Sequence, residues 1–394
     1  MHLPAVPAPS SFATQMSTTD SDRIRQALGG LERCVGDSPD AGKYVFTTVK
    51  LPNNTDTTVK IQDISSLTKL TELRHLQLSG QAITDLSAIV GLPFLAELHV
   101  DHNELDMSIE NCAARWCKEE DDERAWNSGD RSIGSVLEVV NLSFNKIVGP
   151  IGDHSKHRFL RSLDLSNNPT MQTLGPGLSK LANLKHLNIA NNGISAIKGT
   201  ALPTSLTSLN LSSNGLQTID CVSHLFLLEI ICLDANCIRT LSPLAACSKL
   251  RICSSKHNVL SDFETIQVLE YNEHLQELSI AGNPLCAVEF VRLRVIAMLQ
   301  QLRTLDNQVV DATDKVKSEV LTGSEHEARA DKWNEMVGTP FIDMVEAFQV
   351  NPKQDQKLIQ EAIRLSAENV VANVITNSIT PRVDTAGNGA QRPR

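Results

Sequence analysis

Residues 203–240, PTSLTSLNLSSNGLQTIDCVSHLFLLEIICLDANCIRT, contain one pattern twice. The pattern is L-x-x-L-x-L-x-x-N-x-L: its first copy begins at Leu206, and its second begins 22 residues later at Leu228 with Ile at two of the Leu positions. Such a unit predicts a short strand, a turn closed by Asn and a connection back to the next strand. One unit alone cannot bury its apolar side, so it needs neighbours of the same kind.

The same frame extends over most of the chain. The Asn position falls at Asn54, Gln81 (a substitute), Asn103, Asn145, Asn168, Asn192, Asn214, Asn236, Asn258 and Asn283. This periodicity predicts an α/β leucine-rich-repeat solenoid. A 22-residue period leaves about a dozen residues for the return path, enough for a short helix only. We therefore expect a parallel sheet on the concave side and short 3₁₀ or α segments on the convex side.

Each position within the repeat has its own physical role. Because strand side chains alternate between faces, Leu209 and Leu211 should point inward and the residues between them outward. The Asn carries both amide donors and a carbonyl acceptor, so it can pair backbone groups that an inward turn would leave without partners. At Gln81 this role is uncertain from sequence, because the side chain is longer.

The composition restricts the class of protein. The 394 residues are 41% hydrophobic with a formal net charge of −10, a balance that argues against nucleic acid or an anionic membrane as a partner. Nine cysteines are an odd number and lie mostly inside the repeat frame, which predicts a reducing, cytoplasmic setting. Neither a signal peptide nor an apolar run long enough to span a membrane is evident, so we expect a soluble protein.

The frame also predicts the organisation of the chain. We expect a disordered tail at 1–19, a helical cap at 20–43, repeats at 44–285 with an insertion at 106–135, a repeat cap at 286–323, a helical segment at 324–379 and a disordered tail at 380–394.

The N-terminal cap is predicted from helical spacing. Ile24, Ala27, Leu28 and Leu31 recur at helical intervals, and Gly29-Gly30 or Gly36 would end the helix. The frame Phe46-x-x-Val49-x-Leu51-x-x-Asn54 then reads as a first, degenerate repeat.

The insertion contains Lys118–Arg124 (KEEDDER) between Trp116 and Trp126. One interpretation is a solvated charged segment, as charge runs usually are. The other is a docking arm anchored on a partner by the two Trp side chains. Cys112 and Cys117 lack further ligands nearby, so no metal site is expected there.

The C-terminal third changes character. Residues 287–299 predict an amphipathic helix with Arg292 and Arg294 opposite an apolar face made of Val288, Val291, Val295, Met298 and Leu299. Residues 302–306 form half a repeat. Beyond them, apolar residues at 341–348, 358–365 and 370–375 predict three short helices, with starts at Thr339-Pro340 and Asn351-Pro352. These helices either form a small bundle or become ordered on a partner.

No catalytic constellation is evident. The chain has no Gly-rich phosphate loop, no G-x-S-x-G and no H-E-x-x-H. His154 and His157 lack partners at ligand spacing and are interpreted as surface residues. We expect neither an enzyme nor a cofactor, metal or small-molecule substrate.

The outward strand residues remain as candidates for binding proteins. The small Ser and Asn residues in the middle of the repeat series fit a plain solvated face. Two groups differ: the polar cluster Glu97, His99 and Asp101, and the apolar group Ile230, Cys232 and Ile252. Exposed apolar side chains are explained either by a partner or by simple tolerance.

Two stretches resemble known proteins. AVEFVRLRVIAMLQQLRTLDNQVV (287–310) resembles the C-terminal cap of the short-repeat leucine-rich class, which includes type-one phosphatase regulators and axonemal dynein light chain one. Residues 29–51 and 61–105 are similar to the start of the leucine-rich repeat-containing protein twenty-three family of ciliary radial spokes. The resemblance covers about residues 26–320. The charged insertion and the helical segment after the cap depart from that pattern, and the segment faintly resembles a ubiquitin-associated module.

The resemblance implies a non-enzymatic scaffold in the axoneme of motile cilia or flagella, part of the cytoskeleton, with radial-spoke or axonemal proteins as partners. One alternative is a regulatory subunit that binds a protein phosphatase on its concave face. Another is an adaptor in ubiquitin or transport pathways that acts through the C-terminal helices.

Overall fold

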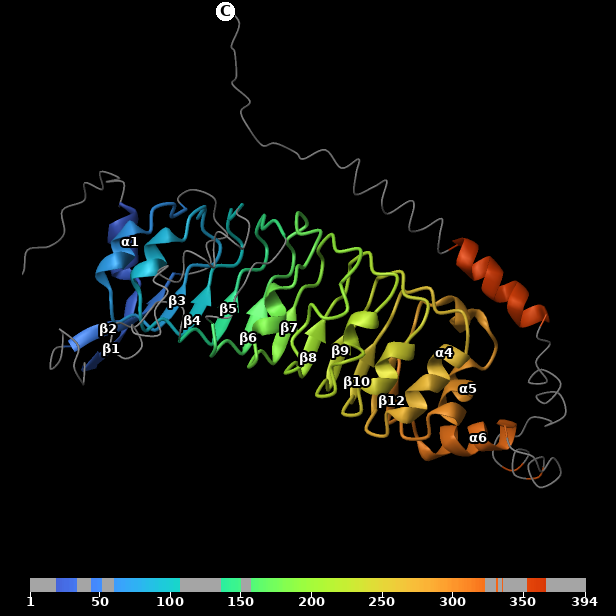
Figure 1. Ribbon diagram of the computed structural model, residues 1–394. Helices are drawn as coiled ribbons and strands as arrows, with labels where there is room; N and C mark the ends of the chain where they lie inside the picture. The colour runs from blue at the N-terminus through green and yellow to red at the C-terminus, as the bar shows by residue number, and fades with distance from the viewer. Residues whose placement is uncertain are drawn as a thin grey trace, which may run out of the picture. The chain divides into compact units, whose positions relative to one another are not determined.

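The computed structural model describes residues 19–33, 44–51, 60–106, 136–149, 157–322, 331, 335 and 353–365. These residues form two compact units. Figure 1 labels their helices and strands. Unit 1 comprises residues up to 215 together with 220–228, and unit 2 comprises 216–219 and the residues from 229 onward. The insertion with Trp116 and Trp126 and the two predicted tails lie outside the described residues, apart from Thr19 and Asp106.

Unit 1 begins with helix α1 (Asp20–Gln26) and continues as a sheet whose strands follow chain order. Its strands are β1 (Leu28–Arg33), β2 (Tyr44–Lys50), β3 (His75–Gln77), β4 (Glu97–His99), β5 (Val139–Asn141), β6 (Ser162–Asp164), β7 (His186–Asn188) and β8 (Ser208–Asn210). The pair β1–β2 is antiparallel, and the pairs from β2 to β8 are parallel. The connections contain the 3₁₀ helices η1 (Ser65–Lys69), η2 (Ser87–Gly91), η3 (Gly177–Lys180) and η4 (Asp220–Val222).

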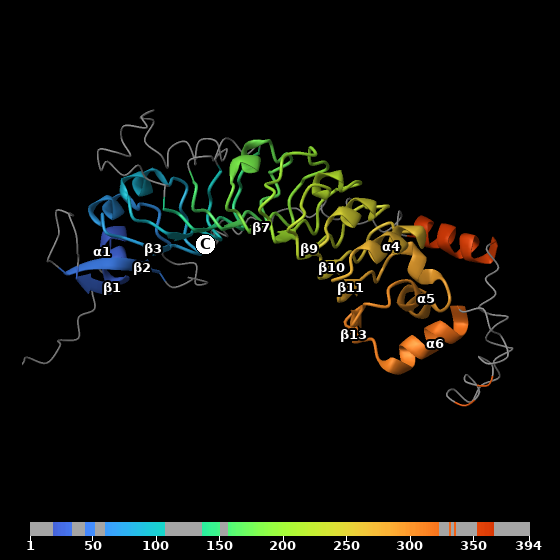
Figure 2. The same ribbon diagram turned by 60° about the horizontal axis from the view of Figure 1, so that its bottom comes forward.

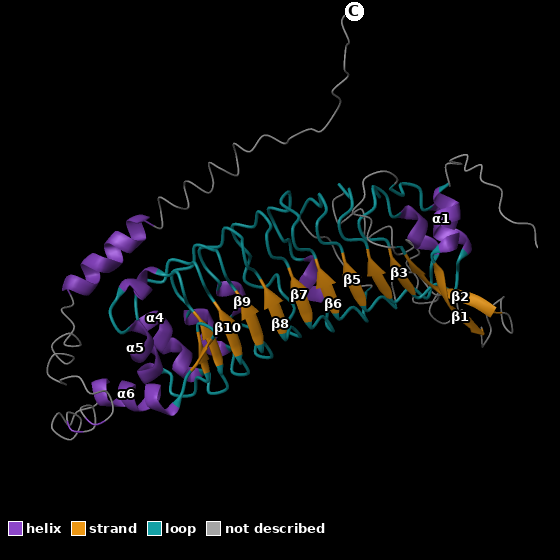
Figure 3. Cartoon of the chain, turned by 180° about the vertical axis from the view of Figure 1, so that it is seen from behind, coloured by secondary structure: helices purple, strands orange, loops and turns teal. Residues whose placement is uncertain are grey.

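Unit 2 continues the same repeat and then ends it. Its strands are β9 (Ile230–Cys232), β10 (Ile252–Ser254), β11 (Glu277–Ser279), β12 (Thr304–Leu305) and β13 (Gln308–Val309). Its helices are η5 (Ser242–Ala246), α4 (Glu264–Gln267), η6 (Val268–Tyr271), η7 (Pro284–Ala287), α5 (Val291–Met298), α6 (Ala312–Thr322) and a helix over 353–365. In both units the strands lie along one side and the short helices along the other (Figure 3).

The repeated leucines form the core, as the alternation predicts. Leu187, Leu209 and Ile231 on the strands are at most 2% exposed. Leu67, Leu178 and Leu244 on the 3₁₀ helices are also fully buried. The sheet and the short helices therefore enclose an apolar interior between them, which confirms the predicted leucine-rich-repeat solenoid.

The repeated Asn residues join one repeat to the next. Asn103 Nδ2 donates to the carbonyl oxygens of Leu78 (2.9 Å) and Val100 (3.1 Å), while Asn103 Oδ1 accepts from the N–H of Ile83 at 3.1 Å. The backbone groups inside the turn are thus paired without water. Equivalent bonds involve Asn145, Asn168, Asn192, Asn214, Asn258 and Asn283.

Gln81 fills the same position, which removes the uncertainty left by the sequence. Its Oε1 accepts from the N–H of Ile61 at 3.1 Å, and its Nε2 donates to the carbonyl of Ser79 at 3.2 Å. At the last repeat Asp306 takes part of the role, because its Oδ1 accepts from the N–H groups of Ile280 and Ala281.

The N-terminal cap differs from the prediction. Helix α1 ends at Gln26, and Leu28 and Leu31 lie in strand β1 rather than in a helix. Gly30 adopts a left-handed φ of +61°, and its carbonyl accepts from the hydroxyl of Thr47 at 2.7 Å. The Gly-Gly pair thus starts an antiparallel hairpin instead of ending a longer helix.

The predicted first repeat is also only partly correct. Val49 and Leu51 are buried as expected, but Phe46, at the first Leu position of the frame, is 38% exposed. Phe46 lies opposite Leu31 in the β1–β2 hairpin. Hairpin pairing, rather than the repeat geometry, sets its direction.

The C-terminal cap contains α5 and α6 side by side (Figure 2). Of the predicted apolar face, Val288, Val295 and Leu299 are buried, whereas Val291 and Met298 are half-buried. The prediction for the arginines is wrong, because neither lies on a simple solvated face. Arg292 Nη2 is 2.7 Å from Asp314 Oδ2 of α6 and 3.0 Å from the carbonyl oxygen of Val309, and Arg294 is 8% exposed.

Candidate interaction surface

The outward side chains of strands β2–β8 form one surface, here named the unit 1 strand face. The register aligns them in rows along the sheet. The row that includes Glu97 consists of Thr48, His75, Glu97, Val139, Ser162, His186 and Ser208. The next row consists of Lys50, Gln77, His99, Asn141, Asp164, Asn188 and Asn210.

The predicted cluster Glu97, His99 and Asp101 lies on this face. Glu97 and His99 both point outward from β4 and are partly exposed. Glu97 Oε2 is 3.0 Å from Nδ1 of His75 on the adjacent strand, and both side chains are more than 40% exposed. The pair is therefore solvated and contributes little to the stability of the fold.

Asp101 is less available than the sequence indicates. Its side chain is 15% exposed. Its Oδ1 accepts from the Ser79 hydroxyl at 2.6 Å and from Asn141 Nδ2 at 3.4 Å, and its Oδ2 lies 3.1 Å from His102 Nδ1. The carboxylate therefore connects three repeats, and a partner would have to compete with these bonds.

The same arrangement continues along the face. Asp164 Oδ1 accepts from both the N–H and the hydroxyl of Ser166, and its Oδ2 accepts from Asn188 Nδ2 at 2.9 Å. Asn188 and Asn210 likewise accept from the backbone N–H two residues later. The polar side chains of unit 1 thus shape their own turns in addition to facing solvent.

The residue directly before each repeated Asn has a left-handed backbone conformation. His102, Phe144, Asn167, Asn191 and Ser213 have φ between 54° and 59°. The rings of His102 and Phe144 stack with centroids 4.0 Å apart, and Phe144 is 46% exposed. Outward strand positions alone did not reveal this pair. The signal was a Phe directly before the repeat Asn, where the turn directs the side chain away from the core.

The outward side chains of β9–β13 form the unit 2 strand face, which is less polar. Ile230 lies opposite Ile252 in the register, and Ile230 is 37% exposed. Glu277, Thr304 and Val309 extend the same row, and Val309 is 75% exposed. The predicted Ile230 and Ile252 are therefore adjacent, while sequence reasoning missed Val309, which follows the turn at Asp306-Asn307.

Cys232, the third predicted member, is partly buried next to Ser254 in the register. Burial, followed by the nearby Asp234 carboxylate, raises the pKa of its thiol above the usual value. The neutral thiol prevails at physiological pH, so Cys232 acts as a small apolar side chain rather than a nucleophile.

The β1–β2 hairpin presents a further apolar group that the sequence did not single out. Leu31 is 59% exposed, Tyr44 is 69% exposed, and Phe46 lies between them in the pairing. The alternation of β2 places Tyr44 and Phe46 on the same side as Thr48 of the unit 1 strand face. The signal was present in the run YVFTTVK, which alternates as a strand before the repeat begins.

The histidine and cysteine residues follow the packing of the repeat. His157 is 3% exposed, so the surface position predicted for it is wrong. It occupies the position of Leu181 and Leu225, three residues before the first Leu of a repeat, where its carbonyl accepts from the N–H of Leu160. His154 lies outside the described residues. Among the residues that the structure describes, no group of three His, Cys, Asp or Glu side chains is placed to hold a metal ion.

Within the same described ranges, no helix combines the length and apolar character needed to cross a membrane.

Comparison with protein families supports the repeat assignment. The family described as Leucine Rich repeats (2 copies) matches residues 158–203, and the family described as Leucine Rich repeat matches residues 203–221. The chain therefore contains leucine-rich repeats, and the second match lies within residues 203–240.

Curated relatives match a quarter of the chain. Cilia- and flagella-associated protein 410 of Mus musculus is 30% identical over 100 residues, which cover 25% of this chain and 40% of that protein. The Homo sapiens protein of that name is 33% identical over 100 residues, 25% of this chain and 38% of that protein. U2 small nuclear ribonucleoprotein A′ of Candida glabrata is 28% identical over 92 residues, 23% and 35% of the two chains. The chain thus spans less than half the length of these relatives.

Among solved structures, an internalin (inlF) of Listeria monocytogenes is similar with a TM-score of 0.46 and 21% identity, covering 75% of this chain and 91% of that one. The functional domain of InlJ from the same organism has a TM-score of 0.45 and 17% identity, covering 71% and 60%.

Proposed function

We propose that this chain is a non-enzymatic scaffold that binds other proteins through its strand faces. The observation that carries the proposal is the adjacent pair Ile230 and Ile252 on the unit 2 strand face, with Val309 in the same row beyond Glu277 and Thr304. Large apolar side chains at regular outward positions of a sheet lower the free energy when a partner removes them from water. Their row is continuous with polar residues, as in the centre and rim of a protein interface.

We place this scaffold in motile cilia, as a radial-spoke component of the axoneme. Two observations support the placement. The N-terminal stretch and cap resemble the leucine-rich repeat-containing protein twenty-three family, and the curated relatives include cilia- and flagella-associated proteins over a quarter of the chain. The partners would then be spoke or axonemal proteins, with neither nucleic acid nor membrane involved.

A tagged copy in ciliated cells tests the placement. We expect the protein to remain with axonemes after detergent extraction and to be released with the spokes at high salt. A protein found wholly in the detergent-soluble cytosol would contradict it. The double variant Ile230→Ser with Val309→Ser should fold normally and lose its axonemal retention, whereas the matched variant Ser162→Ala on the unit 1 strand face should keep it.

The structure gives no specific support to the phosphatase alternative. Glu97 and Asp101, the acidic residues that such a role would use, already contact His75 and Ser79. Phosphatase activity that co-purifies with the wild-type protein, and that disappears on changing Glu97 and Asp101 to Ala, would favour that alternative over the scaffold.

A further inference from the structure

The helix over residues 353–365 has one half-buried face. Asp355, Leu358, Ile359, Ala362 and Ile363 are partly buried, while the other residues of the helix are exposed. These five positions follow the i, i+3, i+4, i+7, i+8 spacing that places side chains on one side of a helix. An isolated helix of this length is only marginally stable in water, so its order depends on the surface that this face contacts.

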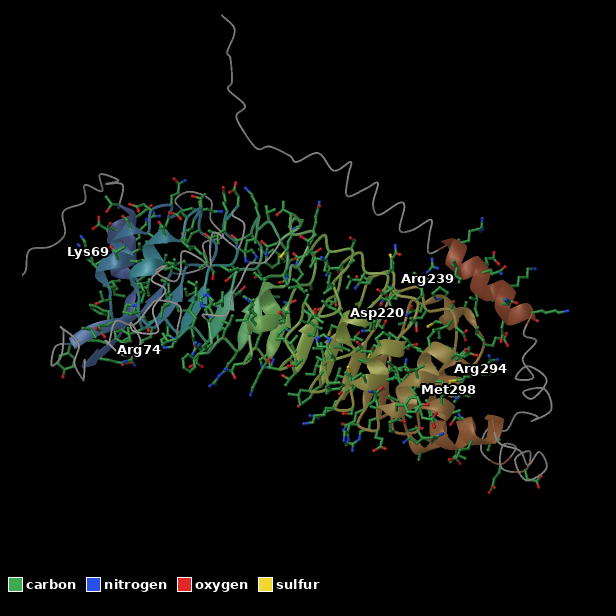
Figure 4. The ribbon with its side chains drawn as sticks, viewed as in Figure 1. Lys69, Arg74, Asp220, Arg239, Arg294 and Met298 are labelled. Atoms are coloured by element: carbon green, nitrogen blue, oxygen red, sulfur yellow. The ribbon has the colours of Figure 1, made fainter. Side chains whose placement is uncertain are left out.

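Arg294 on α5 forms the polar part of that surface. Its Nη1 is 3.0 Å from Asp355 Oδ2, and the two side chains are 10% and 20% exposed. Arg294 is labelled in Figure 4. The guanidinium carbon lies 5.5 Å from the ring centroid of Phe263, which precedes α4. The guanidinium is therefore held against an aromatic ring while it binds the carboxylate of the helix, a geometry that suits Arg and not Lys.

The location of Asp355 determines which orientation of the helix this contact favours. It lies in the first turn of the helix, where a carboxylate also interacts favourably with the helix dipole. The apolar residues follow one and two turns later. The surface around Arg294 therefore distinguishes a helix that begins with an acidic residue from one that is reversed or begins with a basic residue.

Next to this surface, the repeat cap is held together by the hydrogen bonds and ion pair of Arg292. Arg292 binds Asp314 of α6 and the carbonyl oxygens of Leu305 and Val309. These bonds connect α5, the β12–β13 hairpin and α6 without the helix of 353–365. Dissociation of that helix would thus leave the Arg292 contacts of the cap intact.

The 30 residues between Thr322 and Lys353 make the contact a tethered one. Because the helix and the surface belong to one chain, the helix competes for that surface at a higher effective concentration than a free peptide at low concentration does. A partner helix can compete with such a tethered segment if it has the same pattern and additional contacts elsewhere.

We propose that the surface around Arg294 and Phe263 is a reversible helix-docking site, whose resident is the chain's own residues 353–365. A partner helix with an acidic residue in its first turn and apolar residues three, four, seven and eight positions later displaces it. This site is separate from the strand faces, and the proposal does not rest on a ciliary location.

A labelled peptide with the sequence of residues 351–367, NPKQDQKLIQEAIRLSA, is the probe, and full-length protein is the receptor. The wild-type chain should bind the peptide weakly, because its own helix occupies the site. The full-length Asp355→Arg variant should bind it about tenfold more tightly or better, because loss of the ion pair releases the resident helix. Lys357→Glu, on the exposed side of the helix, is the matched control and should behave as wild type.

A charge exchange tests the contact itself. Full-length Arg294→Asp should not bind the wild-type peptide and should bind a peptide carrying Asp355→Arg. The proposal is overturned if the Asp355→Arg chain binds the peptide no more tightly than wild type, or if the two peptides bind Arg294→Asp equally. Circular dichroism and thermal unfolding establish that each variant is folded, and the Asp355→Arg result stands alone if Arg294→Asp does not fold.

Discussion

The two strand faces are made from the same repeat but carry different chemistry. Along β3–β8 of unit 1, outward side chains bond to one another across strands, as Ser79 with Asp101 and Asn188 with Asp164, and the exposed Tyr44 and Phe46 of that unit lie on the β1–β2 hairpin. On unit 2, the corresponding outward row begins with Ile230 and Ile252 side by side and continues through Glu277 and Thr304 to Val309. The repeat frame fixes which residues face outward and leaves their chemistry open. A polar face that bonds to itself is stable in water alone, whereas an apolar row gains free energy from a partner.

The largest difference in stability is expected between variants of two adjacent residues on β9. Ile231 is fully buried and Ile230 is 37% exposed. Ile231→Ala should lower the free energy of unfolding by about 3 kcal/mol through lost burial and a cavity. Ile230→Ala should lower it by less than about 1 kcal/mol, because only part of its area is buried. Urea unfolding of the two variants measures both values, and equal losses would contradict the assignment of inward and outward positions.

The repeated Asn residues of unit 1 should show the next largest effect on stability. Asn168→Ala removes the acceptor for the N–H of Ile147 and the donor for the carbonyls of Leu142 and Leu165. Buried groups left without partners should lower the free energy of unfolding by about 2 kcal/mol or more. The neighbour Asn167→Gly suits the left-handed φ of 59° and is the control, with a change of less than about 1 kcal/mol. A larger loss for Asn167→Gly than for Asn168→Ala would reverse the roles given to these two residues.

Alkaline pH should destabilise both units through buried thiols. Burial raises the pKa of Cys221 to about 12 in unit 1 and of Cys247 to about 11 in unit 2, from the ordinary 9.0. The folded state therefore keeps protons that the unfolded state loses above pH 9, so stability decreases as pH rises through this range. Each thiol should contribute about 1.4 kcal/mol per pH unit until its folded pKa is reached.

Cys247→Ala separates this effect from other alkaline titrations. The difference between its free energy of unfolding and that of the wild type should be constant below pH 9 and should shift by about 1.4 kcal/mol per unit between pH 9 and 11. A difference that stays constant up to pH 11 would show that the Cys247 thiol titrates in the same way in the folded and unfolded chains.

The smallest effect is expected on the polar face. Glu97→Gln removes the charge that faces His75, but both side chains are more than 40% exposed. The free energy of unfolding should change by less than about 0.5 kcal/mol at moderate salt. A loss above about 1 kcal/mol in thermal unfolding would mean that the stability of unit 1 depends on this pair. The pair could then not be described as a solvated part of the strand face.

The repeat frame made most of the fold predictable, because it depends on local spacing. Leu209 faces inward and Asn103 joins repeats as the pattern requires. The misses arose where contacts distant in sequence prevail over that frame. Phe46 is directed outward by its pairing with Leu31, and Arg294 is buried because Phe263 and Asp355 contact it.

The candidate surfaces were predictable in position but not in partner chemistry. Alternation placed Ile230, Ile252 and Glu97 outward, and they do point outward. It did not show that Asp101 is bonded to Ser79 and Asn141, since those contacts depend on the register between strands. Whether the predicted residues bind a partner stays a prediction, and Trp116 and Trp126 lie outside the described residues.

Cross-linking of lysines in detergent-extracted axonemes, followed by mass spectrometry, tests most directly whether the strand faces bind other proteins. Lys50 and Lys256 lie on the strand side of the repeats, and Lys69 and Lys180 lie in or at the end of 3₁₀ helices on the other side. We expect cross-links to partner proteins at Lys256 and Lys50, with Lys256 the stronger because it lies on the strand side of unit 2, which carries Ile230 and Ile252. Partner cross-links confined to Lys69 and Lys180 would contradict binding through the strand faces.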